Sequence, residues 1–378
     1  MDRRSFLKLA TLAAVAPAIV VDALQSADPV ATKRLLQLNA YPLDAETPLE
    51  LLNTYITPND LFFIRSHYIS ARVNPDTWTL SIDGAVSRPM HLTLADLLKT
   101  PKVEATCVLQ CAGNGRSLFK PTMPGVQWRQ GAVGNALWGG VRVRDVLERA
   151  GLRGWARHLH TFGSDIPPRQ VPPFHRSLEI EKVMQDAIIA YEMNGEPLAY
   201  EHGAPARLIV PGWAGDHWMK WLRRMSPSPA PQSGFYMDTA YRYPLRPGNS
   251  GQKLEPGQMQ PITELFVKST ITSVPRKARV GAPVIARGFA FSGTPDIDRV
   301  ELSEDDGRTW RPAELDPRHD PYAWRLWSYR WTPAAAGIHR LIARAIDSRG
   351  SMQPRDPVWN QSGYLHNGWH SITVEVTA

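Results

Sequence analysis

Residues 106–117 read TCVLQCAGNGRS and contain both cysteines of the protein, Cys107 and Cys111. Residues 103–109 are predicted to form a short buried strand, and the Gly-Asn-Gly run at 113–115 tolerates left-handed backbone. The chain is therefore expected to turn sharply just after Cys111, and the thiol stands on a rigid strand end that faces open space. Core packing is the common role of a cysteine, so a reactive role for Cys111 depends on the rest of the sequence.

The first residues predict export by the twin-arginine route. Arg3 and Arg4 precede a short apolar run at residues 9–21 and a small-residue site near residue 27, so residues 1–27 are assigned as a signal peptide. The run contains Pro17 and is shorter than the about 20 apolar residues of a membrane span. No stable span is expected, and a retained anchor is the alternative. Because this route carries folded proteins, we expect a cofactor inserted before export and a periplasmic location.

The cysteine spacing limits the chemistry of the mature protein. In a strand, residues four apart are separated by about 13 Å, roughly twice what a disulfide allows. No disulfide is therefore expected between Cys107 and Cys111. Two cysteines without a Cys-x-x-Cys-His motif also exclude an in-chain c-type haem, an iron–sulfur cluster and a cysteine-rich zinc site.

The net charge of +7 comes from 43 Lys and Arg against 36 Asp and Glu in 378 residues. The basic residues form no cluster, and export argues against a nucleic-acid partner. A small anion or an acidic protein is the expected partner.

The first two thirds of the chain, residues 28–255, predict an α+β cofactor-binding domain. Residues 28–60 are helix-leaning, and residues 61–68 are predicted to form a buried strand that puts Arg65 and His67 on one face, with a surface pair as the alternative. Further predicted strands span residues 78–84, 157–162, 188–191 and 208–210. Predicted short helices span residues 92–98, 143–150 and 178–183.

Two further features of this domain are singled out. His158 and His160 alternate on a predicted strand, where strand packing is favoured over a metal site because no third ligand is near. Residues 213–221 mix large and polar side chains, which is typical of a pocket wall.

In the last third of the chain, apolar and polar residues alternate with the period of two that is typical of β-strands. Residues 241–260 have the Pro, Gly, Asn and Gln content of a linker, and residues 256–378 predict an all-β, immunoglobulin-like sandwich. The expected strands span residues 266–274, 284–291, 299–303, 324–331, 338–346 and 371–376. No catalytic motif falls inside this region, so it is expected to serve as an interface or scaffold.

The common catalytic signatures are missing: there is no G-x-S-x-G, no Walker loop and no G-x-G-x-x-G after a strand. What remains is one positioned thiol and several basic side chains at strand ends. They are Arg65, His67, Arg116, His202, Arg207 and Lys220. Cations that converge on one pocket suit an anionic cofactor and an anionic substrate, and a thiolate suits a soft transition metal.

At this point the sequence resembles the sulfite oxidase family of molybdopterin enzymes. Residues 109–114 (LQCAGN) look like its cysteine loop, whose cysteine is the protein ligand to molybdenum, and residues 62–67 (FFIRSH) look like its Phe-Phe-x-Arg-x-His strand. Residues 191–198, His202 with Arg207, and residues 220–222 are similar to its pterin-binding half. Similar motifs continue through the C-terminal region, at residues 300–310 and 359–370.

The resemblance implies a molybdenum–molybdopterin cofactor in which Cys111 binds the metal. It implies that four residues surround the substrate: Arg65, Arg116, Trp128 and Tyr241. It implies that six residues hold the pterin and its phosphate: Phe63, His67, Asp165, His202, Arg207 and Lys220. The implied activity is oxidation of sulfite to sulfate, in which the metal and pterin do the redox work and the protein orients the anion.

Two positions depart from the animal members of this family. Those members read Asn-Arg-Arg where this chain has Asn-Gly-Arg with Gly115, and they carry an arginine where Ser362 stands here. The Asn-Gly-Arg form looks more like the bacterial sulfite and sulfane dehydrogenases, in which the catalytic subunit has no haem domain. Electrons are then expected to leave through another protein such as a c-type cytochrome, and a homodimer or heterodimer is implied.

Two alternatives stand beside a sulfite dehydrogenase. One is a sulfane dehydrogenase that acts on protein-bound or organic sulfur. The other is a non-enzymatic exported binding protein built on the sandwich, which would contain no molybdenum.

Overall fold

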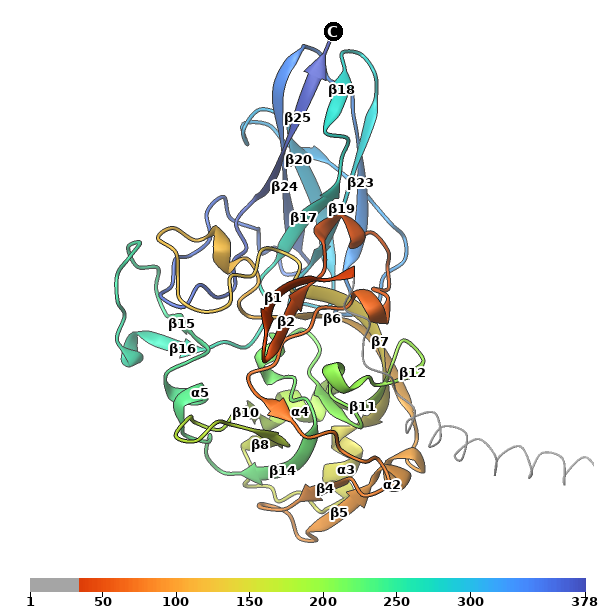
Figure 1. Ribbon diagram of the computed structural model, residues 1–378, viewed down its shortest axis with the longest axis vertical. Helices are drawn as coiled ribbons and strands as arrows, with labels where there is room; N and C mark the ends of the chain where they lie inside the picture. Colours follow the sequence, from red (N-terminus) through yellow and green to blue (C-terminus); the bar gives the residue numbers. More distant parts are fainter. Residues whose placement is uncertain (1–33) are drawn as a thin grey trace, which may run out of the picture.

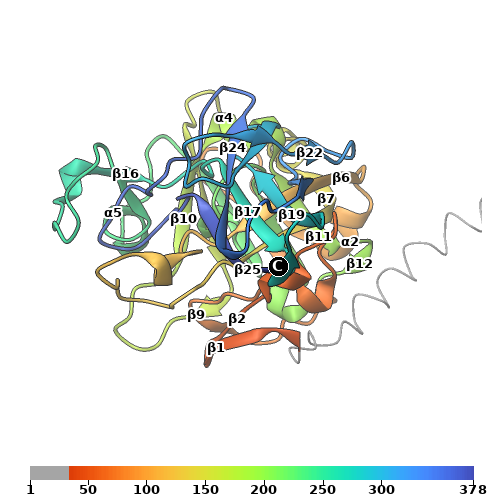
Figure 2. The same ribbon diagram turned by 90° about the horizontal axis from the view of Figure 1, so that it is seen from above.

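The computed structural model describes residues 34–378, so the predicted signal peptide lies outside the described residues. Figure 1 shows a narrow β-sandwich, β17 to β25, standing on a broader part of the molecule, β1 to β16, which we call the body. Viewed from above in Figure 2, the sandwich lies over the body, and β16 and α5 project to one side. No helix among the described residues is long and apolar enough to cross a membrane.

The first sheet of the body carries the segment that leads to Cys111. Its strands run in the order β12-β11-β7-β6, and β13 pairs with β11. The strands are β6 (Val103–Gln110), β7 (Val133–Arg142), β11 (Ile188–Met193), β12 (Glu196–Pro197) and β13 (Arg207–Ile209). β6 pairs antiparallel with β7 from Val103 opposite Gly140 to Gln110 opposite Val133. The buried strand predicted at residues 103–109 is therefore confirmed.

The second sheet of the body has the order β10-β8-β14-β4-β5. Its strands are β4 (Thr79–Ile82), β5 (Met90–Thr93), β8 (His158–Gly163), β10 (His175–Glu179) and β14 (Leu222–Ser228). Three short strand pairs complete the body: β1 (Leu36–Ala40) with β2 (Leu43–Glu46), β3 (Ile69–Ser70) with β9 (Asp165–Ile166), and β15 (Arg242–Pro244) with β16 (Met259–Pro261). One apolar core, which includes Leu80, Leu109, Trp138 and Leu159, is shared by the two sheets.

The helices are short and few, so the described part of the chain is β-rich rather than an even mixture. The α-helices are α2 (Leu94–Leu98), α3 (Val143–Arg149), α4 (Ile180–Asp186) and α5 (Phe235–Asp238). The 3₁₀ turns are η2 (Leu49–Leu51), η3 (Asn59–Leu61), η4 (Arg116–Leu118), η5 (Tyr200–His202), η6 (Gly215–His217) and η7 (Pro256–Gln258). Thr93 caps α2 through a reciprocal hydrogen-bond box with Asp96, which confirms the predicted start of that helix.

Two sequence-based expectations for the body are wrong, and one predicted helix begins later than expected. The helix-leaning segment contains the β1–β2 hairpin, because Leu36 and Leu38 alternate with polar residues at the period of a strand. Residues 61–68 are extended and mostly buried but form only one isolated bridge, between Ile64 and Ala45. The helix predicted at residues 178–183 is present as α4 but begins at Ile180, because Leu178 lies in β10 and pairs with Leu159.

The predicted linker at residues 241–260 contains its own short structure, since β15, η7 and the start of β16 all lie within it. Antiparallel pairing of β15 with β16 folds this segment back on itself. The segment therefore forms part of the arm that projects from the body in Figures 1 and 2.

The sandwich confirms all six strands predicted for the last third of the chain. One sheet has the order β17-β19-β23-β22, and the other has the order β18-β25-β24-β20-β21. The strands are β17 (Lys268–Ser273), β18 (Lys277–Arg279), β19 (Val284–Phe291), β20 (Ile297–Ser303), β21 (Arg311–Pro312), β22 (Glu314–Leu315), β23 (Arg325–Trp331), β24 (Gly337–Asp347) and β25 (His370–Thr377). Ile271 and Trp327 from one sheet pack with Leu341 and Val374 from the other.

A second apolar cluster joins the body to the sandwich. It includes Leu52 and Val108 from the body and Phe289 and Trp324 from the sandwich. The backbone N–H of Val108 also donates to the carbonyl oxygen of Tyr322 at 3.0 Å. The strand that leads to Cys111 is therefore held from both sides.

Two adjacent glycines in β7 test the close packing of β7 against β11 in the first sheet of the body. A Cβ atom on Gly140 would lie 2.1 Å from the carbonyl oxygen of Ile189, whereas one on Gly139 would meet the flexible side chains of Lys102 and Glu192 at 2.9 Å and 3.0 Å. We expect Gly140→Ala to lower the free energy of unfolding by about 2–3 kcal/mol, because backbone in a sheet centre cannot retreat. Gly139→Ala is the matched control and should change it by less than about 1 kcal/mol. Equal urea midpoints for the two variants would contradict this packing.

Candidate active site

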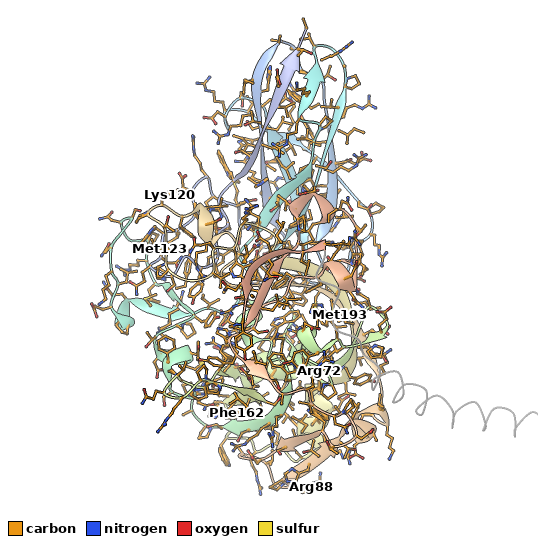
Figure 3. The ribbon with its side chains drawn as sticks, viewed as in Figure 1. Arg72, Arg88, Lys120, Met123, Phe162 and Met193 are labelled. Atoms are coloured by element: carbon orange, nitrogen blue, oxygen red, sulfur yellow. The ribbon has the colours of Figure 1, made fainter. Side chains whose placement is uncertain are left out.

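A solvent-open cavity of about 700 Å³ lies in the body. Its walls come from segments that are far apart in the sequence, including the end of β6, the extended residues 62–67 and the turn after β13. Nine of the eleven predicted site residues line it. They are Phe63, Arg65, His67, Cys111, Asp165, His202, Arg207, Lys220 and Tyr241. Figure 3 shows side chains packed through the body around Arg72 and Phe162, whereas Lys120 and Met123 lie on a loop closer to the sandwich.

Cys111 reaches the cavity because β6 ends immediately before it and the chain then turns. Its N–H donates to the carbonyl oxygen of Ala132 at 3.0 Å, and its own carbonyl accepts from the N–H of Asn114 at 2.9 Å. Gly115 has φ of 90°, the left-handed conformation that the sequence predicted for this turn. Both cysteines are free thiols. Cys111 is partly exposed, and Cys107 is fully buried.

Arg65 is held at the cavity wall by a buried carboxylate. Its Nη1 lies 3.1 Å from Oδ1 of Asp44, a residue of β2 that is only 1% exposed. Asp44 also accepts hydrogen bonds from the N–H of Ser66 and the side chain of Asn39. Because a bound carboxylate fixes the planar guanidinium in one orientation, Arg65 is presented to the cavity in a defined direction.

His67 and Tyr241 form a hydrogen-bonded pair across the cavity. The Tyr241 hydroxyl lies 2.6 Å from Nε2 of His67, and the His67 ring stacks on Phe174 at 4.1 Å between ring centroids. Burial, together with the positive charges of Arg65, Lys220 and Arg176, holds the pKa of His67 well below its usual value. The imidazole is therefore neutral and accepts the hydrogen bond that the Tyr241 hydroxyl donates.

The other side of the cavity carries positive charge that is buried. Arg207 donates to the carbonyl oxygens of His202 at 2.9 Å and Trp218 at 3.3 Å, and its buried Nε has no partner. Lys220 donates to the Ser66 hydroxyl at 2.7 Å. Burial lowers the pKa of Arg207 to about 9, and burial with the charge of Arg207 lowers the pKa of Lys220 to about 7.

These groups fit an anionic cofactor. Among the ion pairs within residues 34–378, none joins Arg207 or Lys220 to a carboxylate. Asp165 is near, and burial raises the pKa of its carboxyl to about 6, so this carboxylate is still mostly charged at neutral pH and only partly offsets the charge of Lys220, with which it forms no ion pair. A buried cation is stable when an anion accompanies it, so the cavity is complementary to a phosphate-bearing ligand.

Arg116 and Trp128 do not line the cavity. The Arg116 guanidinium donates to the carbonyl oxygens of Ser362 and Val126, each at 2.9 Å. Trp128 is completely buried and packs edge-on against the Phe63 ring at 6.4 Å. The structure thus places both residues behind the wall, and direct contact of either with substrate stays a prediction.

Sequence reasoning missed Asp44, which holds Arg65 from behind the wall, and Phe174, which lines the cavity. Asp44 lies in the segment misread as helix-leaning, and Phe174 precedes a strand whose start was not recognised. Asp216 falls inside the predicted pocket wall at 213–221, and that wall is confirmed because Asp216 and Lys220 both line the cavity. The Nε2 atom of His160 lies 2.9 Å from the carbonyl oxygen of Ala230, and no three His, Cys, Asp or Glu side chains among the described residues form a metal-binding group.

Comparison with known protein families assigns the class of this protein. A model described as the oxidoreductase molybdopterin binding domain matches residues 67–236, and one described as the Mo-co oxidoreductase dimerisation domain matches residues 259–377. The chain is therefore a molybdopterin-dependent oxidoreductase.

The chain belongs to the sulfite oxidase family. It is 36% identical to mitochondrial sulfite oxidase of Rattus norvegicus over 93% of this chain and 68% of that protein. It is 32% identical to sulfite oxidase of Arabidopsis thaliana, covering 90% of this chain and 94% of that protein. The solved sulfane dehydrogenase SoxCD from Paracoccus pantotrophus matches with a TM-score of 0.78 and 29% identity, over 89% of this chain and 85% of that one. The family and the molybdenum cofactor predicted from the sequence are confirmed.

The buried charge of Lys220 predicts a pH dependence for the cofactor-free protein. Its pKa is about 7 when folded and 10.5 as a free side chain, so the unfolded chain binds the extra proton between these values. The free energy of unfolding should therefore rise with pH from 7 to 10.5. Below pH 7, the full energetic cost of burying the charged Lys220 ammonium should destabilise the folded protein. We expect cofactor-free Lys220→Met to be at least about 1 kcal/mol more stable than wild type at pH 6.5, with the difference shrinking toward pH 10.

Lys102→Met is the control for this experiment, because Lys102 is paired with Glu104 at 2.9 Å and with Glu192. Removing that cation should lower stability slightly at pH 6.5. Urea unfolding at four pH values measures both variants. A Lys220→Met variant that is less stable than wild type at pH 6.5 would show that the buried ammonium is not penalised.

Proposed function

We propose that this protein oxidises sulfite to sulfate, with the molybdenum cofactor bound in the cavity of the body. The observation that carries the proposal is the convergence of one thiol, Cys111, with buried cations from distant segments on a single cavity. The overall reaction takes one oxygen atom from water and releases two protons and two electrons for each sulfite. An anionic substrate and an anionic cofactor both need the positive charge that this cavity supplies.

The residues divide by the group that each would hold. Cys111 would supply the thiolate ligand to the metal. Six residues would hold the pterin and its phosphate: Phe63, His67, Asp165, His202, Arg207 and Lys220. When bound, the cofactor supplies oxygen-atom transfer and accepts the electrons.

The chain itself binds and orients the sulfur oxyanion. Arg65 presents a charged donor whose direction is fixed by Asp44 at 3.1 Å. The Tyr241 hydroxyl, hydrogen-bonded to neutral His67, supplies a second polar group on the same cavity. Arg116 adds positive charge behind the wall, while its guanidinium is held by two carbonyl oxygens.

A second candidate substrate is a protein-bound or organic sulfane. It is favoured by the similarity to the sulfane dehydrogenase from Paracoccus pantotrophus, which extends over 89% of this chain. The solvent-open cavity would admit an extended substituent on sulfur. Assays with free sulfite and an artificial electron acceptor separate the two, because a sulfane dehydrogenase would turn over free sulfite poorly.

The cellular setting is part of the same proposal. The twin-arginine motif at the N-terminus supports export to the periplasm, and the absence of a haem-attachment motif from the sequence supports a separate electron acceptor such as a c-type cytochrome.

We further propose a boundary near residue 255 between a catalytic domain and an immunoglobulin-like domain. The name of the matched second family model supports dimerisation through that domain.

Substitution of Arg65 tests the substrate assignment. Arg65→Gln should raise KM for sulfite at least about tenfold, because a desolvated anion loses a charged partner. Arg224→Gln is the control, since Arg224 forms an exposed pair with Asp83 at 2.7 Å on the second sheet. Steady-state kinetics with sulfite and an artificial acceptor measure both. An unchanged KM for Arg65→Gln would remove Arg65 from the substrate site.

A further inference from the structure

Two arginines and two tyrosines form a stack beside the cavity. The rings of Tyr241 and Tyr364 are stacked with centroids 5.1 Å apart and an interplanar angle of 14°. The guanidinium carbon of Arg176 lies 5.3 Å from the Tyr241 ring centroid, and that of Arg116 lies 5.2 Å from the Tyr364 ring centroid. Tyr241 lines the cavity, so the ring that faces substrate is one layer of a larger assembly.

Arg176 is the least exposed member of this stack. It lies on β10, the edge strand of the second sheet, and yet its exposed fraction is 0%. Its Nη2 lies 2.8 Å from Oδ2 of Asp216 and 3.2 Å from Nε2 of His217, and its Nη1 donates to the carbonyl oxygen of Tyr236. Burying a guanidinium is unfavourable unless such partners surround it, so Arg176 is held in one place from several sides.

The partners of Arg176 connect it directly to the cavity. Asp216 and Tyr241 both line the cavity, and Arg176 contacts both of them. Arg176 belongs to none of the motifs from which the site residues were predicted. A guanidinium that makes a cation–π contact with one wall residue and an ion pair with another restricts both side chains at once.

Tyr241 needs such restriction because its backbone is in an uncommon conformation. Its φ is 55°, in the left-handed region that non-glycine residues seldom adopt, which is maintained only where surrounding contacts fix it. Its hydroxyl must also stay 2.6 Å from Nε2 of His67 to keep the hydrogen bond across the cavity.

We propose that Arg176 is a positioning residue that holds the Tyr241 hydroxyl against His67 through the cation–π contact of its guanidinium with the tyrosine ring. The kinetic part of this inference rests on the proposed sulfur-oxidising function. The structural part, which concerns where the hydroxyl lies, does not. Lysine keeps the charge that pairs with Asp216 but lacks the guanidinium that lies over the Tyr241 ring and donates to Tyr236, so Arg176→Lys removes the guanidinium contacts while it retains the charge.

A double-mutant cycle tests this role. Arg176→Lys should lower kcat/KM for sulfite at least about tenfold in the wild-type background and less than about twofold in a Tyr241→Phe background, where no hydroxyl remains to be positioned. If wild type prefers a sulfane, the cycle is measured with that substrate. Equal losses in the two backgrounds would mean that Arg176 acts on the fold or through Asp216 alone, and would overturn the proposal.

Arg325→Lys is the control variant, because Arg325 is a mostly buried arginine that pairs with Asp296 at 3.1 Å in the sandwich. It should change kcat/KM less than about twofold in both backgrounds.

The crystal structure of the Arg176→Lys protein supplies a readout that does not depend on activity. The Tyr241 hydroxyl should move beyond hydrogen-bond distance of His67, about 3.5 Å. A hydroxyl that stays in place would overturn the proposal even if activity falls. If wild-type protein oxidises neither sulfite nor a sulfane, the proposed function fails, and the crystal structure still decides the role of Arg176. Should Arg176→Lys fail to fold, Arg176→Gln is measured by the same cycle, and equal losses in the two backgrounds would again overturn the proposal.

Discussion

The active site depends on two buried cations, Arg207 and Lys220, that form no ion pair with a carboxylate among the described residues. Arg207 is 3% exposed and has an unpartnered Nε, and Lys220 is held by a hydroxyl and a carbonyl oxygen instead of a carboxylate. Buried cations of this kind destabilise the folded protein when the cavity is empty, and they stabilise it once an anion fills the cavity. Cofactor binding and folding stability are therefore coupled.

The sandwich contributes to the site although it supplies no residue of the cavity wall. Val108 on β6 donates to the carbonyl oxygen of Tyr322, and the N–H of Leu365 donates to the carbonyl oxygen of Ala112, one residue beyond the thiol. The carbonyl oxygen of Ser362 accepts from Arg116 at 2.9 Å. The cysteine loop is thus held between the two parts of the molecule, and we infer that damage to their contact would displace Cys111.

Local patterns in the sequence predicted much of this structure. The alternating strands of the sandwich, the capped helix after Thr93 and the turn at Gly115 depend on residues close in sequence, and all three are confirmed. The hairpin at β1 and β2 was missed because its short apolar run carries a weak signal. The partners of the site were missed for a different reason. Asp44 and Arg176 do not line the cavity, and they contact its wall residues Arg65 and Asp216 only through tertiary ion pairs between positions distant along the chain.

The central claim is that Cys111 binds molybdenum in this cavity, and X-ray absorption at the molybdenum edge tests it most directly. Wild type and the control Cys107→Ala, which changes only a fully buried thiol, should each contain about one molybdenum per chain with a protein sulfur ligand. Cys111→Ser should fold but lose both that sulfur ligand and sulfite oxidation. An unchanged sulfur contribution, or retained turnover, in Cys111→Ser would contradict the account.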